Sequence, residues 1–288
     1  SGRVADVEGV PGNPNILYVG SASGGVWRTD DGGLNFEPIF DDQPIASIGD
    51  LALAPTNPGV IYVGTGEANA RNSVSFGNGV YRSTDSGKSW THLGLDDTRH
   101  ISRVLVSSLD PKVVFVGAMG HFFGPNEERG VFRTTDGGQS WEKVLYIDDR
   151  HGVSDMDIDP TNPNVVFAGM WHFDRKPWTH TTGSKEGGVW KSVDGGDTWK
   201  RLEKGLPRGI VGRIGVKVAP SNPEIVYVIA ESDEGTLFRS TDQGETFEKV
   251  SDNVQIVSRG LYYTDMRVDP VDPNRLYAVS SRLFLSID

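Results

Sequence analysis

The chain has 288 residues, of which 23% are charged and 36% hydrophobic, a composition that suits a folded protein with one large core or two smaller ones. No apolar run of about 18 residues occurs, so we expect no membrane-spanning helix. The net charge of −11 argues against a nucleic-acid partner, because phosphates require clustered Lys and Arg. The absence of cysteine excludes disulfides, thiolate chemistry and cysteine-bound zinc. We expect a bacterial protein that is secreted or periplasmic.

One turn motif recurs along the chain with the pattern S/T-x-D-x-G-x-S/T-W/F. In "STDSGKSW" it runs from Ser83 to Trp90, and its sixth copy begins at Ser286. The motif aspartates lie 46 to 58 residues apart, a period close to that of propeller blades. They are Asp31, Asp85, Asp136, Asp194, Asp242 and Asp288.

Each repeat has the pattern of four short strands. In the second repeat, "SIGDLALAP" is the first strand, and an Asn-Pro turn follows it because Pro has a fixed φ and Asn tolerates turn geometry. "VIYVG", rich in β-branched and aromatic residues, is the second strand. "GVYRS" and "SWTHL" form the third and fourth strands on either side of the Asp-Gly turn. Four antiparallel strands per unit, repeated radially, predict a β-propeller.

The predicted fold is all-β: one partial β-propeller domain over residues 1–288, with five complete four-stranded blades and an incomplete sixth. Because the sixth repeat stops within its own motif, we expect the chain to be a fragment of a longer protein. Further blades, or a second chain, would complete the propeller. The predicted blade boundaries are about 1–40, 41–95, 96–147, 148–203, 204–251 and 252–288.

These repeats resemble Asp-box (BNR) repeats, which occur in sialidases, sortilin-type propellers and two-propeller glycoside hydrolases. The segments "GTGEANARNSVSFGNGVYRSTDSGKSW" and "GHFFGPNEERGVFRTTDGGQSW" are similar to those of exported bacterial BNR-repeat proteins. The resemblance covers the whole chain and implies the propeller fold. It implies two kinds of function: a scaffold that binds a ligand or protein, or a glycoside hydrolase of the sialidase-like or two-propeller glucanase-like type.

The Asp boxes themselves are predicted to be structural. Gly87-Lys88-Ser89 has the end of a phosphate-loop pattern, but only this copy contains the Lys, and no helix follows. A calcium loop needs several further oxygen ligands and a distal Glu, which the copies lack. We expect each carboxylate to accept backbone N–H bonds in its turn and each motif Gly to supply a positive φ. The Trp or Phe should pack between blades.

Function is therefore expected on the opposite face, here called the loop face, which carries the loops between second and third strands and the connections between blades. Three of these loops are long, at residues 67–78, 120–129 and 171–187, and long loops in compact folds often carry function. We expect this part of the loop face, on blades 2–4, to bind a glycan or a peptide or protein. The candidate ligand-binding residues are Arg71, Arg99, His100, His121, Arg129, His151, Trp171, His172, Arg175 and Trp178.

Histidines flank two of the predicted hairpins. His100 and His121 lie at the two ends of one hairpin, and His151 and His172 at the ends of the next. Each pair should approach in space, because the first strand begins where the second ends. Arginine suits an anionic ligand, and histidine suits proton transfer or metal binding; the alternative is a solvated face with scattered ion pairs.

A second set of polar residues recurs at one level of the first strands, which line the propeller axis. The set contains Asp6, Asp50, Asp155 and Asp265, with Arg103 and Gly215 at the remaining positions. Such a ring could hold calcium or another divalent cation. The alternative, which we favour, is that the carboxylates accept hydrogen bonds from the backbone of neighbouring blades.

Catalytic residues are not identified by any one motif. A sialidase-like enzyme needs a Tyr–Glu pair, so Glu67, Tyr262 and Tyr263 are the candidates; Arg3 lies near the start of the first strand, but no Arg-Ile-Pro follows it. A two-propeller hydrolase uses paired acids in a cleft, and no such pair can be assigned here. The competing function is recognition, with Trp171 and Trp178 stacking on a ligand.

Overall fold

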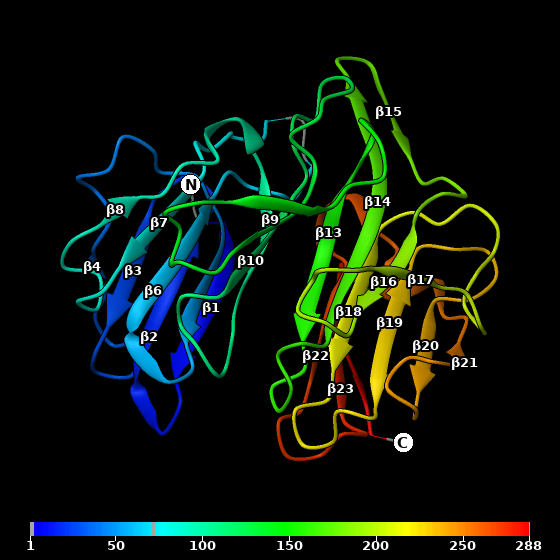
Figure 1. The fold of residues 1–288 in the computed structure, drawn as a ribbon. Coiled ribbons are helices and arrows are strands. Elements are labelled where there is room, and N and C mark those ends of the chain that lie inside the picture. The colour runs from blue at the N-terminus through cyan, green and yellow to red at the C-terminus, as the bar shows by residue number, and fades with distance from the viewer. Residues whose placement is uncertain (1–2, 71–72, 288) are drawn as a thin grey trace. The chain divides into compact units, whose positions relative to one another are not determined.

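A computed structural model describes residues 3–70 and 73–287 (Figure 1). Arg71, Asp288 and the side chain of Tyr263 lie outside the described part. The chain is all-β and forms six antiparallel sheets in sequence order. It divides into two compact units, residues 1–121 with 126–143 and residues 122–125 with 144–288. We call them the first and second unit.

The first unit holds three four-stranded blades, and its boundary falls within the last strand. In each blade, sequence neighbours pair side by side, as predicted for a meander. The strands are β1 (Val4–Val10), β2 (Asn13–Ser21), β3 (Val26–Thr29), β4 (Glu37–Pro38); β5 (Ile48–Ala54), β6 (Asn57–Thr65), β7 (Val80–Ser83), β8 (Thr91–His92); β9 (Ile101–Val106), β10 (Val114–Ala118), β11 (Gly130–Thr134), β12 (Glu142–Leu145). The 3-10 helix η1 (Asp96–Thr98) precedes β9.

The second unit holds the other three blades, which have five, four and three strands. Two short helices, η2 (Val254–Val257) and α1 (Gly260–Tyr263), connect the last two blades. The strands are β13 (His151–Ile158), β14 (Val166–Lys176), β15 (Thr179–Thr182), β16 (Gly188–Ser192), β17 (Lys200–Leu202); β18 (Ile214–Val218), β19 (Val226–Ala230), β20 (Leu237–Ser240), β21 (Glu248–Ser251); β22 (Asp265–Val268), β23 (Leu276–Val279), β24 (Leu283–Ser286).

Two features of the blades correct the prediction. Six blades form, rather than five and an incomplete sixth: β22, β23 and β24 pair into a three-stranded sheet of their own. The predicted long loop 171–187 is largely a hairpin, in which β14 continues to Lys176 and pairs with β15. The threonine-rich run Thr179–Thr182 favours a strand, since β-branched residues fit the pleated sheet.

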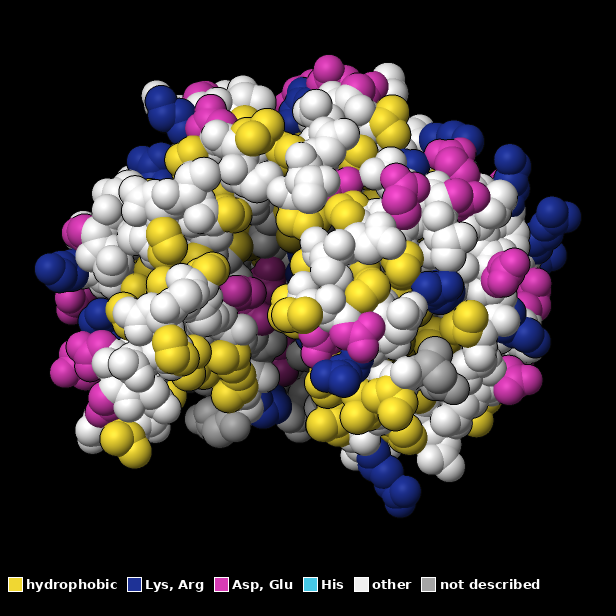
Figure 2. Space-filling view, turned by 90° about the horizontal axis from the view of Figure 1, so that it is seen from below, with side chains coloured by type: hydrophobic (Ala, Val, Ile, Leu, Met, Phe, Trp, Pro, Cys, Tyr) yellow, Lys and Arg dark blue, Asp and Glu magenta, His cyan; other side chains and the backbone are white. Residues whose placement is uncertain are grey.

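Apolar side chains from adjacent blades meet and form the core within each unit. Between the second and third blades, Tyr62, Val104 and Val116 belong to one buried cluster. In the second unit, Phe167 of β14 and Val216 of β18 belong to another. Short strands thus gain stability from packing blade against blade, because burial of apolar surface drives folding. Figure 2 shows further apolar side chains on the lower surface of each unit, mixed with charged ones.

Each described Asp box is a closed turn. The Asp85 carboxylate accepts bonds from Ser83 Oγ at 2.8 Å and from Ser89 N at 2.9 Å and Oγ at 2.6 Å. These bonds, with the one from Ser89 Oγ foremost, lower the pKa of Asp85 to about 2. The motif glycines have φ between 83° and 92°, a conformation that glycine adopts without strain. The bonds from the hydroxyl two residues before and from the backbone N–H four residues on also occur at Asp31, Asp136, Asp194 and Asp242.

In two boxes the aromatic residue links one blade to the next, whereas Trp199 Nε1 donates to Gly196 O of its own box at 3.1 Å. Trp90 Nε1 donates to Ile39 O at 2.6 Å, and Trp141 Nε1 donates to Leu93 O at 2.8 Å. Both acceptors belong to the preceding blade, so the indole adds a directional bond to its packing. The boxes therefore consolidate the turns and the seams between blades. Of the helices in the described ranges, none is long and apolar enough to cross a membrane.

Candidate functional site

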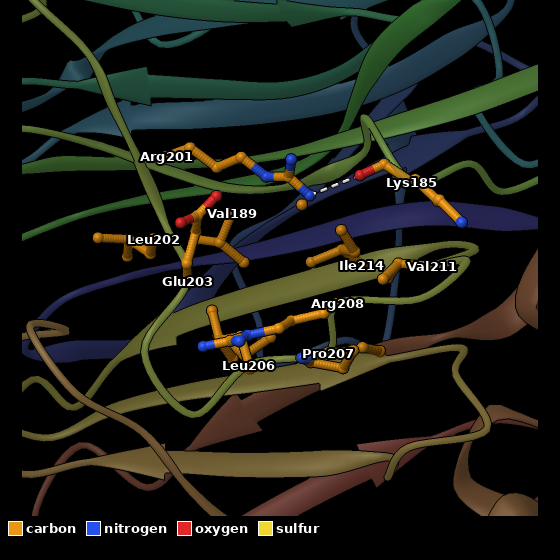
Figure 3. Close-up of a pocket in the computed structure, with 13 residues that line it drawn as sticks. Lys185, Val189, Arg201, Leu202, Glu203, Leu206, Pro207, Arg208, Val211 and Ile214 are labelled. Carbon is orange, nitrogen blue, oxygen red and sulfur yellow. Dashed lines mark hydrogen bonds between the residues drawn. The ribbon is translucent and has the colours of Figure 1, made fainter.

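The second unit has a pocket on its loop face, at the seam between β16–β17 of one blade and β18–β19 of the next. Its volume is about 320 Å³, within the usual size range of ligand pockets. Figure 3 shows Arg201 and Lys185 along one edge, Arg208 with Leu206 and Pro207 along the other, and Ile214 and Val211 between them. The apolar lining is Val189, Leu202, Leu206, Val211, Ile214, Val228 and Ala230.

The pocket is lined by strand ends of one blade and by the connection to the next. β16 and β17 contribute Val189 and Leu202, and the connection 203–213 contributes Leu206 and Val211. Val211 is anchored there by an isolated bridge to Ser184, with N–O distances of 3.1 and 2.9 Å. The apolar wall is thus held by backbone hydrogen bonds as well as by packing.

The rim of the pocket is mainly cationic. Arg201 Nη2 donates to the carbonyl oxygens of Lys185 and Gly187, both at 2.7 Å, and so holds the end of the loop (Figure 3). The Lys185 and Arg208 side chains are exposed, and neither makes an ion pair with any described residue. Glu203 is the one acidic residue of the lining. This local positive charge contrasts with the net charge of the whole chain, −11.

Behind the pocket wall, three polar side chains form a hydrogen-bonded row. Asp148 Oδ1 lies 2.7 Å from His151 Nδ1, and His151 Nε2 lies 2.7 Å from Ser184 Oγ. His151 begins β13 and is buried, whereas Ser184 lies in the loop before β16 and is partly exposed. Burial opposes ionisation of Asp148, but its bonds to His151 and to the Arg150 N–H prevail and lower its pKa. The row ties the start of one strand to the loop at the pocket.

The predicted approach of His151 and His172 is found: they are register partners in β13 and β14, with ring centroids 5.4 Å apart. Trp171 is fully buried, and its Nε1 donates to Thr182 Oγ1 at 3.0 Å. Its ring faces the Arg213 guanidinium at 5.8 Å. Trp171 therefore acts as a core residue, and its burial keeps its ring faces away from solvent.

Trp178 and Arg175 differ sharply in environment. Trp178 occupies the turn between β14 and β15 and is 81% exposed. Arg175 is buried, and its backbone N–H donates to Phe122 O at 2.8 Å. Of the two tryptophans expected to stack on a ligand, only Trp178 presents its ring to solvent.

In the first unit, the polar candidates bond to one another. Glu67 is 1% exposed and accepts two bonds from Arg3, at 3.0 Å from Nε and 2.7 Å from Nη2. His100 Nδ1 lies 2.9 Å from Glu67 O. Burial, foremost, lowers the pKa of His100 to about 3, so this imidazole is neutral at physiological pH. The cluster has the character of a buried, satisfied network.

The other described candidates of this unit also make contacts. Arg129 is fully buried, and its Nη2 donates to His121 O at 2.7 Å. His121 Nε2 lies 3.1 Å from Asp97 O. Arg99 stacks over the Phe76 ring at 5.1 Å. In the second unit, the candidate Tyr262 lies in α1, and its backbone N–H donates to Arg259 O at 2.8 Å.

Three of the recurring aspartates join neighbouring blades. Asp6 accepts from Leu51 N at 3.4 Å, Asp50 from Val104 N at 2.7 Å, and Asp155 from Val216 N at 3.0 Å. Each donor lies in the first strand of the following blade. These aspartates therefore accept hydrogen bonds from the backbone of a neighbouring blade, which was the alternative to a metal-binding ring. Asp265 instead pairs with Arg267 at 3.0 Å within its own strand.

Two of these aspartates also make ion pairs. Arg103 lies 3.0 Å from Asp50, and Lys217 lies 2.7 Å from Asp155. Burial and the nearby Asp6 carboxylate nevertheless raise the pKa of Asp50 to about 7. Within residues 3–70 and 73–287, no three His, Asp or Glu side chains gather as a metal-binding group.

Several residues of the seam pocket were missed by the sequence reasoning. Lys185 lies in a loop that was singled out, but Arg201 and Arg208 flank a connection that was not. The D-x-x-H spacing of Asp148 and His151 was a usable signal, because an Asp carboxylate often bonds to groups two or three residues on. No sequence signal identifies Ser184 as their partner.

Comparisons with known proteins agree with the repeats. The family described as BNR/Asp-box repeat matches residues 132–143. The match lies in the third of six blades, so the chain carries a BNR/Asp-box repeat within a β-propeller. Among solved structures, it is similar to an ancestral GH74 enzyme (TM-score 0.72, 19% identity, 98% of this chain and 39% of that one). It is also similar to the GH74 xyloglucanase of Xanthomonas campestris (TM-score 0.70, 17% identity, 99% and 45%).

Curated relatives are of two kinds. Xyloglucanase Xgh74A of Acetivibrio thermocellus is 24% identical over 206 residues, which are 60% of this chain and 23% of the enzyme. The Photosystem II assembly lipoprotein Ycf48 of Picosynechococcus is 30% identical over 146 residues, 42% of each chain. The chain spans less than half the length of these relatives. They include both hydrolases and an assembly factor, so the repeat alone does not define the activity.

Proposed function

We propose that this chain is a ligand-binding propeller scaffold whose ligand occupies the seam pocket of the second unit. The observation that carries the proposal is the combination of an apolar floor with a cationic rim in one cavity of about 320 Å³. Pockets of this kind hold an apolar group by burial and orient it with a few polar groups. The loop face was the expected binding surface, although the pocket lies at the fourth and fifth blades.

The ligand we propose is a protein segment in which an acidic residue follows a large apolar one. The apolar side chain would enter between Leu206 and Ile214, and its acidic neighbour would meet Lys185 or Arg208 at the rim. A peptide supplies both groups at a fixed spacing, and cationic side chains steer anionic partners toward the surface. We further propose a secreted or periplasmic location.

Fluorescence polarisation with blocked pentapeptides tests this proposal. One set places Glu beside Leu or Phe, and a matched set replaces Glu with Gln. We expect binding of the Glu set, weakened at least fivefold by Lys185→Glu with Arg208→Glu and by higher salt. The control, Lys88→Glu with Lys249→Glu, makes the same change in charge at two exposed lysines outside the pocket. Equal binding of the Glu and Gln sets would contradict the proposal.

The second candidate is a glycoside hydrolase, favoured by the similarity to GH74 enzymes over 98% of the chain. Retaining and inverting glycosidases need two carboxyl groups about 5–9.5 Å apart at the scissile bond. Hydrolysis of xyloglucan oligosaccharides or 4-methylumbelliferyl glycosides by the intact protein would support this function. Absence of turnover across that panel, with peptide binding retained, would favour the scaffold.

A further inference from the structure

We infer that Ser184 is an activated nucleophile, with His151 as its general base and Asp148 as the residue that positions the imidazole. The three side chains form the Asp–His–Ser geometry used for acyl transfer, with both contacts at 2.7 Å. The substrate class is an ester of a short acyl group. This inference goes beyond the ligand proposed for the pocket, although the acyl group would extend toward the same pocket.

The hydrogen bonds assign the protons along the row. An ionised carboxylate only accepts hydrogen bonds, so His151 Nδ1 carries the proton shared with Asp148. In the neutral imidazole Nε2 is then an acceptor, and Ser184 Oγ must be its donor. Gly187 N–H donates to the same Ser184 oxygen at 2.9 Å. The serine hydroxyl thus points its proton at a base, as a nucleophile requires.

The row is held rigidly before any substrate binds. Asp148 Oδ1 also accepts the N–H groups of Arg150 at 2.8 Å and His151 at 3.0 Å, which fixes the carboxylate. The backbone N–H and C=O of Ser184 both bond to Val211. Preorganisation of this kind is what makes a positioned base effective.

Ser184 is partly exposed, and residues bonded to it reach the seam pocket. Its side chain is partly exposed, whereas His151 is buried. Its chain neighbour Lys185 and its bridge partner Val211 both line the seam pocket. A short acyl chain can therefore extend toward an apolar surface while its carbonyl meets the serine. The backbone N–H of Gly187 donates to Ser184 Oγ, the oxygen that attacks the carbonyl carbon.

The reaction balances with water as the only co-reactant. Ser184 Oγ forms a bond to the ester carbonyl carbon, and its proton passes to His151 Nε2. The tetrahedral intermediate expels the alcohol, which receives that proton, and leaves an acyl ester on Ser184. Water then attacks this ester with His151 again accepting a proton, which returns to Ser184 Oγ as the carboxylic acid leaves.

The direct test labels the unaltered chain with a fluorophosphonate and maps the adduct by mass spectrometry. We expect one adduct, on Ser184, and none on Ser154, which is bonded to backbone carbonyl oxygens without a histidine. Hydrolysis of p-nitrophenyl butyrate should be lost in Ser184→Ala. No adduct on Ser184, under conditions that fully label a serine esterase, would overturn the inference.

Variants separate catalysis from a structural role. His151→Gln should slow labelling at least about 100-fold, the usual size of a general-base contribution. Asp148→Asn should lower kcat for p-nitrophenyl butyrate and leave KM unchanged, because Asp148 acts through His151. If both variants keep the native melting temperature and label at the native rate, the row is only structural. Lys88→Glu with Lys249→Glu, at two exposed lysines outside the pocket, should leave the labelling rate unchanged. Peptide binding is measured in a separate assay, so the two proposals can fail separately.

Discussion

Two groups of polar residues, one in each unit, have different roles. In the first unit, Glu67, Arg3 and His100 bond to one another, and burial makes their network a part of the core. In the second unit, Lys185 and Arg208 lie at the rim of a cavity and are exposed. Charged residues on a loop face therefore divide into those that stabilise the fold and those that can meet a ligand. Burial and hydrogen-bond partners, and not residue type, separate the two groups.

The largest expected effect comes from breaking the buried pair of the first unit. Glu67→Gln removes the carboxylate that pairs with Arg3. The Glu67 side chain is only 2% exposed, so the change is made in the interior. We expect a loss of about 3 kcal/mol of unfolding free energy, at the low end for breaking a buried pair, because the Arg3 side chain that remains is 29% exposed. Urea denaturation measures it. A change within 0.5 kcal/mol, roughly that of an exposed site, would show that the pair is not structural.

A smaller loss should follow from opening the apolar wall of the pocket. Leu206→Ala removes a buried side chain that belongs to the core cluster of the second unit. We expect a destabilisation of about 2 kcal/mol, at the low end for such changes because the site already adjoins a cavity. Leu34→Ala, at an 84% exposed site, is the matched control and should be nearly neutral. Thermal unfolding of both variants checks the difference.

Acid should weaken the Asp boxes in both units alike. The pKa of Asp85 and Asp194 is lowered from 3.8 to about 2 by hydrogen bonds from the residue four places on. Their stabilisation is thus complete above about pH 4 and is lost as the pH falls through 2. The melting temperature of Asp85→Asn should lie below that of the unaltered chain at pH 7 and converge with it near pH 2. A difference in melting temperature that stays constant between pH 7 and pH 2 would contradict this role of the Asp85 carboxylate.

The smallest effect on stability is expected at the pocket rim. Arg208→Ala changes an exposed side chain, so unfolding should shift by less than about 0.5 kcal/mol. Binding of the Glu-containing peptides should nevertheless weaken by about 1 kcal/mol, since an exposed charge pair is worth that much at most. The loss of unfolding free energy in Arg208→Ala should be much smaller than in Glu67→Gln, which distinguishes the exposed rim from the buried pair. A large loss of stability in Arg208→Ala would place it in the core instead.

Much of the fold was predictable because the repeat supplies independent copies of the same local signal. The glycines and aspartates of the boxes specify a turn whose bonds lie within seven residues, as at Asp85. The hairpin of β14 and β15 was missed, since Thr179–Thr182 interrupts the repeat and was assigned to a loop. The sixth blade was underestimated because three strands suffice to form its sheet.

The site was less predictable, because its contacts join residues far apart in the chain. Glu67 looks like a candidate acid until the structure pairs it with Arg3, 64 residues away. His151 was identified as a candidate, but its partner Ser184 lies 33 residues on, in a segment without a motif. Local sequence patterns therefore determined the turns, the strands and the face on which to search. Tertiary structure alone decided which charges are buried and which surround a cavity, because burial depends on packing between blades.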